Sequence, residues 1–157
     1  MTQLAFHTGL PDKLGYACRL LRKAWRQGAQ VVVVGGSEEL GRLDQQLWTF
    51  EQEEFVPHLR WRPGSSLSPT LGRSPIHLIT DGHLTDDAFQ AVSSATVLVN
   101  IGQQLPAQAP RFDRVIELVS TDAADVASAR ERWRQYLGLG MAPSNVPFAG
   151  PAADNPS

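Results

Sequence analysis

The sequence has little of what disulfide-linked or membrane-spanning proteins need. Cys18 is the single cysteine in 157 residues, so no intrachain disulfide can form and a reducing compartment is expected. No apolar run approaches the roughly 20 residues that cross a bilayer, and no signal peptide is predicted at the start. These absences favour a cytoplasmic protein that does not contact a membrane.

An excess of positive charge is also absent. The 14 Lys and Arg residues and the 16 Asp and Glu residues leave a formal net charge of -2, with a pI of about 6.1. Proteins that neutralise many phosphates usually carry a clear basic excess, so no direct nucleic-acid ligand is expected. The same net charge also weakens the hypothesis that the tryptophans and arginines bind single-stranded nucleic acid directly. The length suits one domain with a single core.

The short motifs of common catalytic and cofactor sites are missing as well. The chain contains neither G-x-G-x-x-G nor G-x-x-x-x-G-K-[ST], and it has no G-x-S-x-G elbow. Its histidines are scattered, and Asp81-Gly82-His83 alone is not a metal-ligand set. Cys18 falls on the apolar stripe of a predicted helix, where a thiol packs as a small hydrophobe. We therefore predict no catalytic residues, no cofactor and no metal.

Strand and helix patterns alternate through most of the chain. Short apolar runs predict strands at 3–7, 30–34, 76–80, 96–100 and 114–119. Helical spacing of apolar residues extends from an Asp12 cap to Gly28, from a Ser37 cap to Phe50, from Asp86 to Val92, and over about 122–138. This order predicts an α/β fold, a three-layer Rossmann-like sandwich with a mostly parallel sheet and no phosphate-binding loop.

Proline, glycine and alanine mark the segments outside these elements. Residues 60–75 are rich in Pro, Gly and Ser and are predicted to form a mobile loop. From residue 143 onward the chain is rich in Pro and Ala, a composition typical of disorder. We predict one α/β domain at 1–142 and a disordered tail at 143–157.

The turn Gly35-Gly36-Ser37 keeps one catalytic alternative open. It joins a predicted strand to a predicted helix, where backbone amides could cradle a phosphate. A tight turn followed by an N-cap explains the same three residues without any ligand. The alternative to a non-catalytic protein is therefore a small nucleotide- or cofactor-binding α/β enzyme that uses residues 35–37.

Three segments carry a family pattern when they are read together. The most specific is Leu43-Asp44-Gln45-Gln46-Leu47-Trp48-Thr49-Phe50 followed by Phe55-Val56-Pro57-His58. The others are the first strand and helix, ending Ala24-Trp25-Arg26-Gln27-Gly28, and the stretch from Phe112 to Tyr136 with Gly140 after it. Together they resemble the chi subunit family of the bacterial DNA polymerase III holoenzyme over about residues 1–142.

The resemblance implies an adaptor in DNA replication with no catalytic activity of its own. One implied partner is the acidic C-terminal peptide of single-stranded-DNA-binding protein. The other is the psi subunit, through which chi proteins reach the clamp loader. A monomer or a 1:1 heterodimer is expected.

The resemblance also implies where the peptide binds. Family matching gives Arg130 as the anchor, with Val119 and Trp133 forming the pocket. Arg130 and Arg134 are one helical turn apart, so their guanidinium groups can hold a carboxylate while the pocket takes a phenyl ring. In the plain alternative, Arg130, Arg132 and Arg134 form a solvated helix face. Trp133 then belongs to the core stripe, which is predicted as Val126, Ala129, Trp133, Tyr136 and Leu137.

The psi-binding surface maps by resemblance to Trp48 and Phe55. Trp48 lies beside the predicted apolar stripe of its helix, which comprises Leu40, Leu43, Leu47 and Phe50. An aromatic residue off the buried stripe is a candidate interface anchor. Trp48 could equally pack under residues 51–60 as a satellite of the core.

Overall fold

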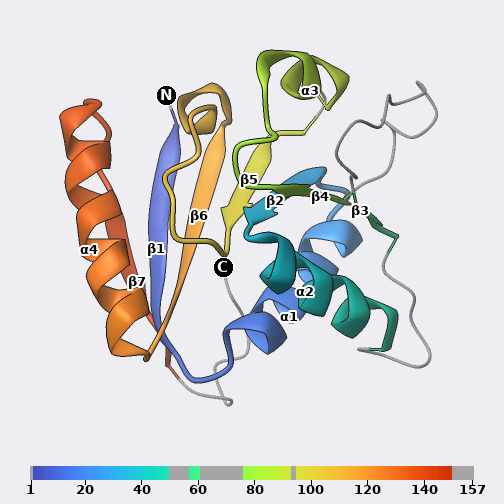
Figure 1. The fold of residues 1–157 in the computed structure, drawn as a ribbon, viewed down its shortest axis with the longest axis horizontal. Helices are drawn as coiled ribbons and strands as arrows, with labels where there is room; N and C mark the ends of the chain where they lie inside the picture. Colours follow the sequence, from blue (N-terminus) through green and yellow to red (C-terminus); the bar gives the residue numbers. More distant parts are fainter. Residues whose placement is uncertain (1, 50–56, 61–75, 93–94, 150–157) are drawn as a thin grey trace.

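The computed structural model describes residues 2–49, 57–60, 76–92 and 95–149, and these form one parallel sheet with helices on both faces (Figure 1). The strands are β1 (Gln3–Leu10), β2 (Val31–Gly35), β3 (Leu59–Arg60), β4 (Ile76–Thr80), β5 (Val97–Asn100), β6 (Arg114–Ser120) and β7 (Ser144–Pro147). The helices are α1 (Lys13–Arg26), α2 (Ser37–Thr49), α3 (Asp86–Ala91) and α4 (Ala123–Gly138), with a 3-10 turn η2 (Ala109–Arg111).

The seven strands lie in the order β3-β4-β2-β5-β6-β1-β7, and every neighbouring pair is parallel. The predicted α/β class is therefore confirmed, and the sheet is wholly parallel rather than mostly so. Each crossover carries the chain back along one face, so both faces need apolar cover. All five residues of β2 are buried, as its run of four valines predicts.

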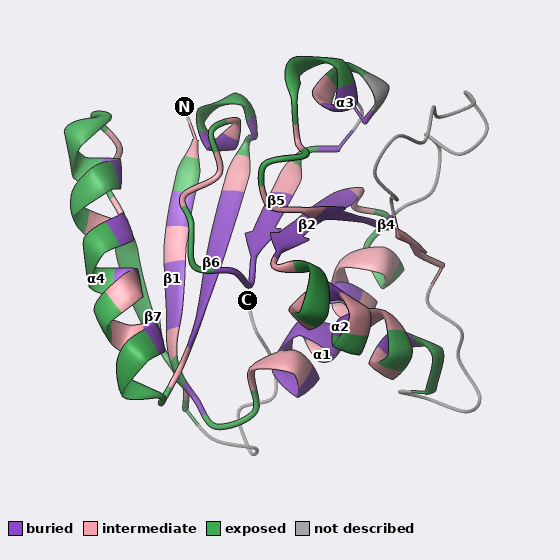
Figure 2. Ribbon diagram, viewed as in Figure 1, coloured by how far each residue is buried: buried purple, intermediate pink, exposed green. Residues whose placement is uncertain are grey.

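Two apolar clusters fill the spaces on either side of the sheet. The first packs α1 and α2 against one face, with Leu21 and Leu43 beside Val33. The second packs α3, η2 and α4 against the other face, with Tyr136 and Phe112. Figure 2 shows the central strands as the most completely buried elements, while α4 is buried along one side only. The three predicted layers are present.

The helix ends follow the predicted signals with one exception. The Asp12 carboxylate accepts a hydrogen bond from the Gly15 amide and caps α1, which ends before Gly28 at a positive φ of 78°. The prediction that Ser37 caps α2 is wrong. Ser37 is the first residue of the helix, and its hydroxyl accepts a bond from Arg60 instead.

Two strands were not predicted, and both lie at the sheet edges. β3 has two residues, and β7 has four residues that are all exposed. β7 pairs with Ala5–Thr8 of β1 and lies within the predicted tail; residues 150–157 of that tail lie outside the described residues. Most of the predicted loop, 61–75, is likewise outside the described part. In the described part of the chain, no helix is both long and apolar enough to cross a membrane.

Candidate functional site

A hollow of about 700 Å³ opens where α4 lies over the ends of β1 and β6; we call it the α4 hollow. Its wall is apolar, and its rim is polar or positively charged. The wall consists of Phe6, Gly9, Val119, Val126, Ala129 and Trp133, and the rim of Thr8, Ser120, Thr121, Arg130, Arg134 and Asn145. Val119 on β6 and the three predicted residues on α4, Arg130, Trp133 and Arg134, thus line one cavity. Its volume is in the range of ordinary ligand pockets.

The two arginines at the rim are in different states. Arg130 is exposed, and its guanidinium has no hydrogen bond or ion pair with any residue that the structure describes. Arg134 is also exposed, but its Nη1 lies 3.1 Å from a carboxylate oxygen of Glu131, one turn back. Such an exposed pair is weak. Arg130 is therefore the cation with the most unused hydrogen-bonding capacity at this hollow.

Trp133 forms part of the wall and is partly buried. Its ring packs against Phe6 at 5.1 Å between centroids with a tilt of 52°. Phe6 also meets Tyr136 edge to face, so the aromatic group joins the hollow to the core. A phenyl ring entering the hollow would find an aromatic edge and aliphatic groups, with Arg130 at the rim.

A buried polar network fixes α4 from behind. The carboxylate of Glu117 on β6 is fully buried and accepts from Arg132 Nε at 2.9 Å and from the Tyr136 hydroxyl at 2.6 Å. Asn100 donates to both of its oxygens, at 3.0 and 3.1 Å. Burial raises the pKa of Glu117, while the charge of Arg132 and these hydrogen bonds oppose that rise. Arg132 and Tyr136 thereby hold one side of the helix inward, which leaves Arg130 and Arg134 on the other side.

The structure contradicts one part of the plain alternative for α4 and one residue of its predicted core stripe. Arg132 does not belong to a solvated face with its neighbours; it is 1% exposed and ion-paired. Leu137, placed on the core stripe, is 53% exposed. The sequence did carry a signal for the network, since Glu117 lies between the apolar pairs Val115-Ile116 and Leu118-Val119, and a buried carboxylate needs a partner. Arg132 and Tyr136 are four residues apart on the next helix.

A second network anchors the start of α4. The Asp125 carboxylate accepts bonds from the Ser120 amide at 2.7 Å and from Gln103 at 2.7 Å, and it pairs with Lys13 at 3.2 Å. Although burial disfavours its charge, these hydrogen bonds and Lys13 hold the pKa of Asp125 below its usual range. Because Lys13 begins α1, this pair also links α4 to the helix layer on the opposite face.

The second predicted surface lies on α2, and its motif residues do contact one another. His58 Nε2 lies 2.8 Å from Asp44 Oδ1, and the His58 ring meets Trp48 edge to face at 5.2 Å. Trp48 is 59% exposed, so it is not buried under the following segment. Phe55, the other residue assigned to this surface, lies outside the described residues.

The Gly35–Ser37 turn has a packing explanation. A Cβ on Gly35 would lie 2.6 Å from the Ile101 side chain, so glycine is required for β2 and the end of β5 to come together. Asp81, whose amide donates to the Gly35 carbonyl, and Glu39, beside Gly36, both lie at this turn. Burial raises the pKa of Asp81, and the charge of Glu39 adds to the rise. Two carboxylates beside the turn oppose the binding of a phosphate. The turn therefore gives no support to a nucleotide site.

Cys18 is buried, as predicted, and its surroundings disfavour the thiolate. Burial raises the pKa of this thiol to about 12, and Asp12 adds to the rise. A thiol with so little thiolate at neutral pH is a poor nucleophile. Among the described residues, no group of three or more His, Cys, Asp or Glu side chains could hold a metal ion.

Comparison with known proteins gives one consistent family. The family model described as "DNA polymerase III chi subunit, HolC" matches residues 1–144. The DNA polymerase III subunit chi of Pseudomonas aeruginosa is 34% identical over 132 residues, covering 82% of this chain and 81% of that protein. The subunits chi of Haemophilus influenzae and Escherichia coli are 30% and 25% identical, over 83% and 79% of this chain and 85% and 78% of the respective proteins.

Solved structures at low identity share only the fold. The Hef helicase domain of Pyrococcus furiosus superposes with a TM-score of 0.53 at 14% identity, over 76% of this chain and 28% of that one. The C-terminal domain of Dbp5 from S. cerevisiae gives 0.55 at 14% identity, over 96% and 92% of the two chains. The family model and the Pseudomonas relative decide the assignment: this chain belongs to the DNA polymerase III chi subunit family, whose members are accessory, non-catalytic subunits.

Proposed function

We propose that this protein is a cytoplasmic adaptor of the replicative polymerase. In this proposal the α4 hollow binds the acidic C-terminal tail of single-stranded-DNA-binding protein, and the Trp48 surface binds psi and, through it, the clamp loader. Two separate surfaces on one rigid domain suit a linker, because neither partner needs to displace the other. The single observation that carries the proposal is the exposed Arg130 guanidinium beside an apolar hollow.

The hollow suits a peptide that ends in an aromatic residue with a free carboxylate. Arg130 can donate two parallel N–H bonds to the carboxylate, the geometry in which guanidinium–carboxylate pairs are strongest. The wall formed with Val119 and Trp133 can receive the aromatic ring, and Arg134 adds positive charge beside the entry. Acidic residues further up the peptide would be drawn by these two arginines, so the affinity should fall as salt rises.

The test is calorimetry with two synthetic peptides that differ only at their end. Both carry acidic residues followed by Pro-Phe; one has a free C-terminal carboxylate and the other an amide. We expect the carboxylate form to bind about ten- to a hundredfold more tightly, the size of a lost charge-assisted hydrogen bond. Equal affinity for the two peptides would show that the hollow does not recognise the free C-terminal carboxylate.

A separate prediction concerns the Trp48 surface. We expect Trp48→Ala to weaken binding of a psi subunit by about 2 kcal/mol or more, because large aromatic anchors dominate such interfaces. Trp48 is mostly exposed, so the fold should be little affected. Size-exclusion chromatography of mixed subunits measures complex formation, and the acidic peptide serves as the internal control. If the Trp48→Ala variant loses both partners, the two surfaces are not independent.

A further inference from the structure

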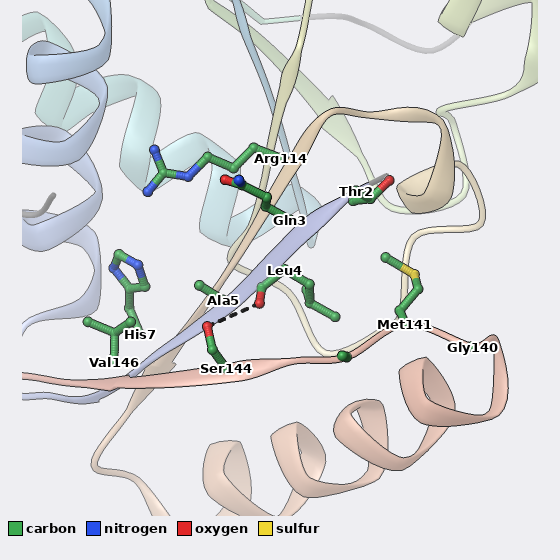
Figure 3. A pocket seen from close by; sticks show the side chains of 11 residues that line it. Thr2, Gln3, Leu4, Ala5, His7, Arg114, Gly140, Met141, Ser144 and Val146 are labelled. Atoms are coloured by element: carbon green, nitrogen blue, oxygen red, sulfur yellow. Dashed lines mark hydrogen bonds between the residues drawn. The ribbon is translucent and has the colours of Figure 1, made fainter.

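A second hollow, of about 550 Å³, lies at the outer edge of the sheet, and we call it the β7 hollow. It opens between the first half of β1 and residues 140–146, of which Ser144 to Val146 belong to β7 and pair with β1. Figure 3 shows the side chains that line it, with Arg114, Gln3 and His7 standing on the same side of β1. Nothing in the proposed adaptor role uses these residues.

The β7 hollow contains one fixed positive charge. Arg114 begins β6 and is partly buried, and its guanidinium makes no hydrogen bond or ion pair with any residue in the described ranges. A partly buried guanidinium is less screened than a surface one, so its attraction for an anion is stronger. His7, the other titratable residue that lines the hollow, adds no second charge. Its pKa is lowered to about 4, first by burial and then by the charge of Arg114.

His7 supplies a directed polar atom that has no partner in the described part of the chain. The residue is 1% exposed, and its Nδ1 lies 2.5 Å from the Tyr16 hydroxyl. Its Nε2 is buried and makes no hydrogen bond with the described residues. Buried polar atoms are almost always satisfied, so this one, on a residue that lines the β7 hollow, is available to a partner bound there. When the Tyr16 hydroxyl donates to Nδ1, the neutral ring carries its proton on Nε2 and can donate to an anion.

The rest of the lining is mixed, with an apolar part suited to a small carbon skeleton. Leu4, Ala5, Met141 and Val146 provide aliphatic surface, and Val146 is 40% exposed although it is apolar. Gln3 adds an amide near Arg114 (Figure 3). Small-ligand sites usually combine apolar surface, which the ligand covers, with a few polar or charged groups that bind it.

From these groups we propose that the β7 hollow binds a small organic monocarboxylate with a compact apolar body. Arg114 pairs with the carboxylate, the Nε2 of His7 donates to it, and Ala5 and Val146 hold the carbon part. One fixed cation matches one negative charge, whereas a phosphate dianion would leave excess charge in a partly buried site. The carboxylate can come from a free small molecule or from the end of a peptide, and both share this chemistry.

This site is distinct from the α4 hollow although both border β1 and β7. Successive side chains of a strand point to opposite faces, and His7 and Val146 line the β7 hollow while Thr8 and Asn145 line the other. The two sets have no residue in common. The proposal therefore does not depend on the adaptor role, and either can fail alone.

The test is a residue-resolved NMR titration of the ¹⁵N-labelled protein with benzoate, with inorganic phosphate, and with N-acetylphenylalanine as a peptide end. We expect benzoate to shift the amides of Ala5, Ser144 and Val146 saturably. Arg114→Met should weaken this binding by roughly ten- to a hundredfold, since it removes the charged bond. Arg42→Met, which removes an equal charge from the exposed face of α2, should leave it unchanged. Arg130→Ala should also leave it unchanged.

A second variant protects the test against a folding defect. Val146→Phe fills the hollow from an exposed position and keeps Arg114, so it too should abolish the benzoate shifts. If wild-type protein shows no saturable shift at these amides, or if Arg114→Met and Val146→Phe bind benzoate as well as wild type, the site is refuted. Tighter binding of phosphate than of benzoate would refute the monocarboxylate class. Comparing benzoate with N-acetylphenylalanine then decides between a free molecule and a peptide end as the source.

Discussion

Replacing Arg132 by Met is expected to destabilise the domain by about 3–5 kcal/mol at pH 8, the usual cost of leaving a buried charge without its partner. The Glu117 carboxylate is fully buried, and Arg132 is its counter-charge at 2.9 Å. Methionine fills similar space without charge, so the loss reports the ion pair rather than a cavity. Urea unfolding followed by tryptophan fluorescence measures the change in the free energy of unfolding.

The same variant should show a distinctive pH dependence. Burial raises the pKa of Glu117, and removing Arg132 takes away the largest influence that opposes this rise. The folded variant then holds a proton that the unfolded chain has released, so its stability falls as pH rises above the ordinary carboxyl range. The deficit should be smaller at pH 5 than at pH 8. Arg134→Met is the matched control; its pair is exposed, and its cost should stay within about 0.5 kcal/mol at both values.

Arg130→Ala should remove binding of the acidic peptide without affecting the fold. The guanidinium is exposed and makes no contact that supports the core within the described residues, so the free energy of unfolding should hardly change. Losing its charged hydrogen bonds should cost about 1.5–3 kcal/mol, which is roughly ten- to a hundredfold in Kd. A contact of modest affinity would then fall below calorimetric detection.

Two companion variants sharpen that result. Arg130→Lys keeps the charge but loses the planar fork, so it should recover only part of the affinity. Arg42→Ala removes an equal charge from α2, and its binding should match that of wild type. Full binding by Arg130→Ala would remove Arg130 as the anchor of the site.

The sequence predicted the buried part of the fold well because apolar periodicity is strong there. β2 is a continuous apolar run, β4, β5 and β6 are mostly apolar, and the helices between them carry apolar stripes. β7 was missed because Ser144–Pro147 is exposed and ends in proline, so neither alternation nor β propensity marks it. That strand forms because β1 offers an edge for it to pair with. Such a long-range contact cannot be recognised from the local sequence.

From the residues alone, only the part of the site that lies on one face of α4 could be predicted. Spacing placed Arg130 and Arg134 together, but Val119 joined them only through the family resemblance, because it lies on a different element. The burial of Arg132 was missed because three arginines alternate along this part of the sequence. Their spacing does not indicate which of them faces a buried carboxylate. Glu117, the carboxylate that selects it, lies 15 residues earlier in the chain.

The most direct test is an NMR titration of the full chain with an acidic peptide ending in Pro-Phe. If the α4 hollow holds the tail, shifts should concentrate on the Trp133 indole, Thr8, Ala129 and the amides around Ser120, and they should vanish in Arg130→Ala. Saturable shifts that gather around Trp48 instead, with the Trp133 indole unmoved, would contradict it.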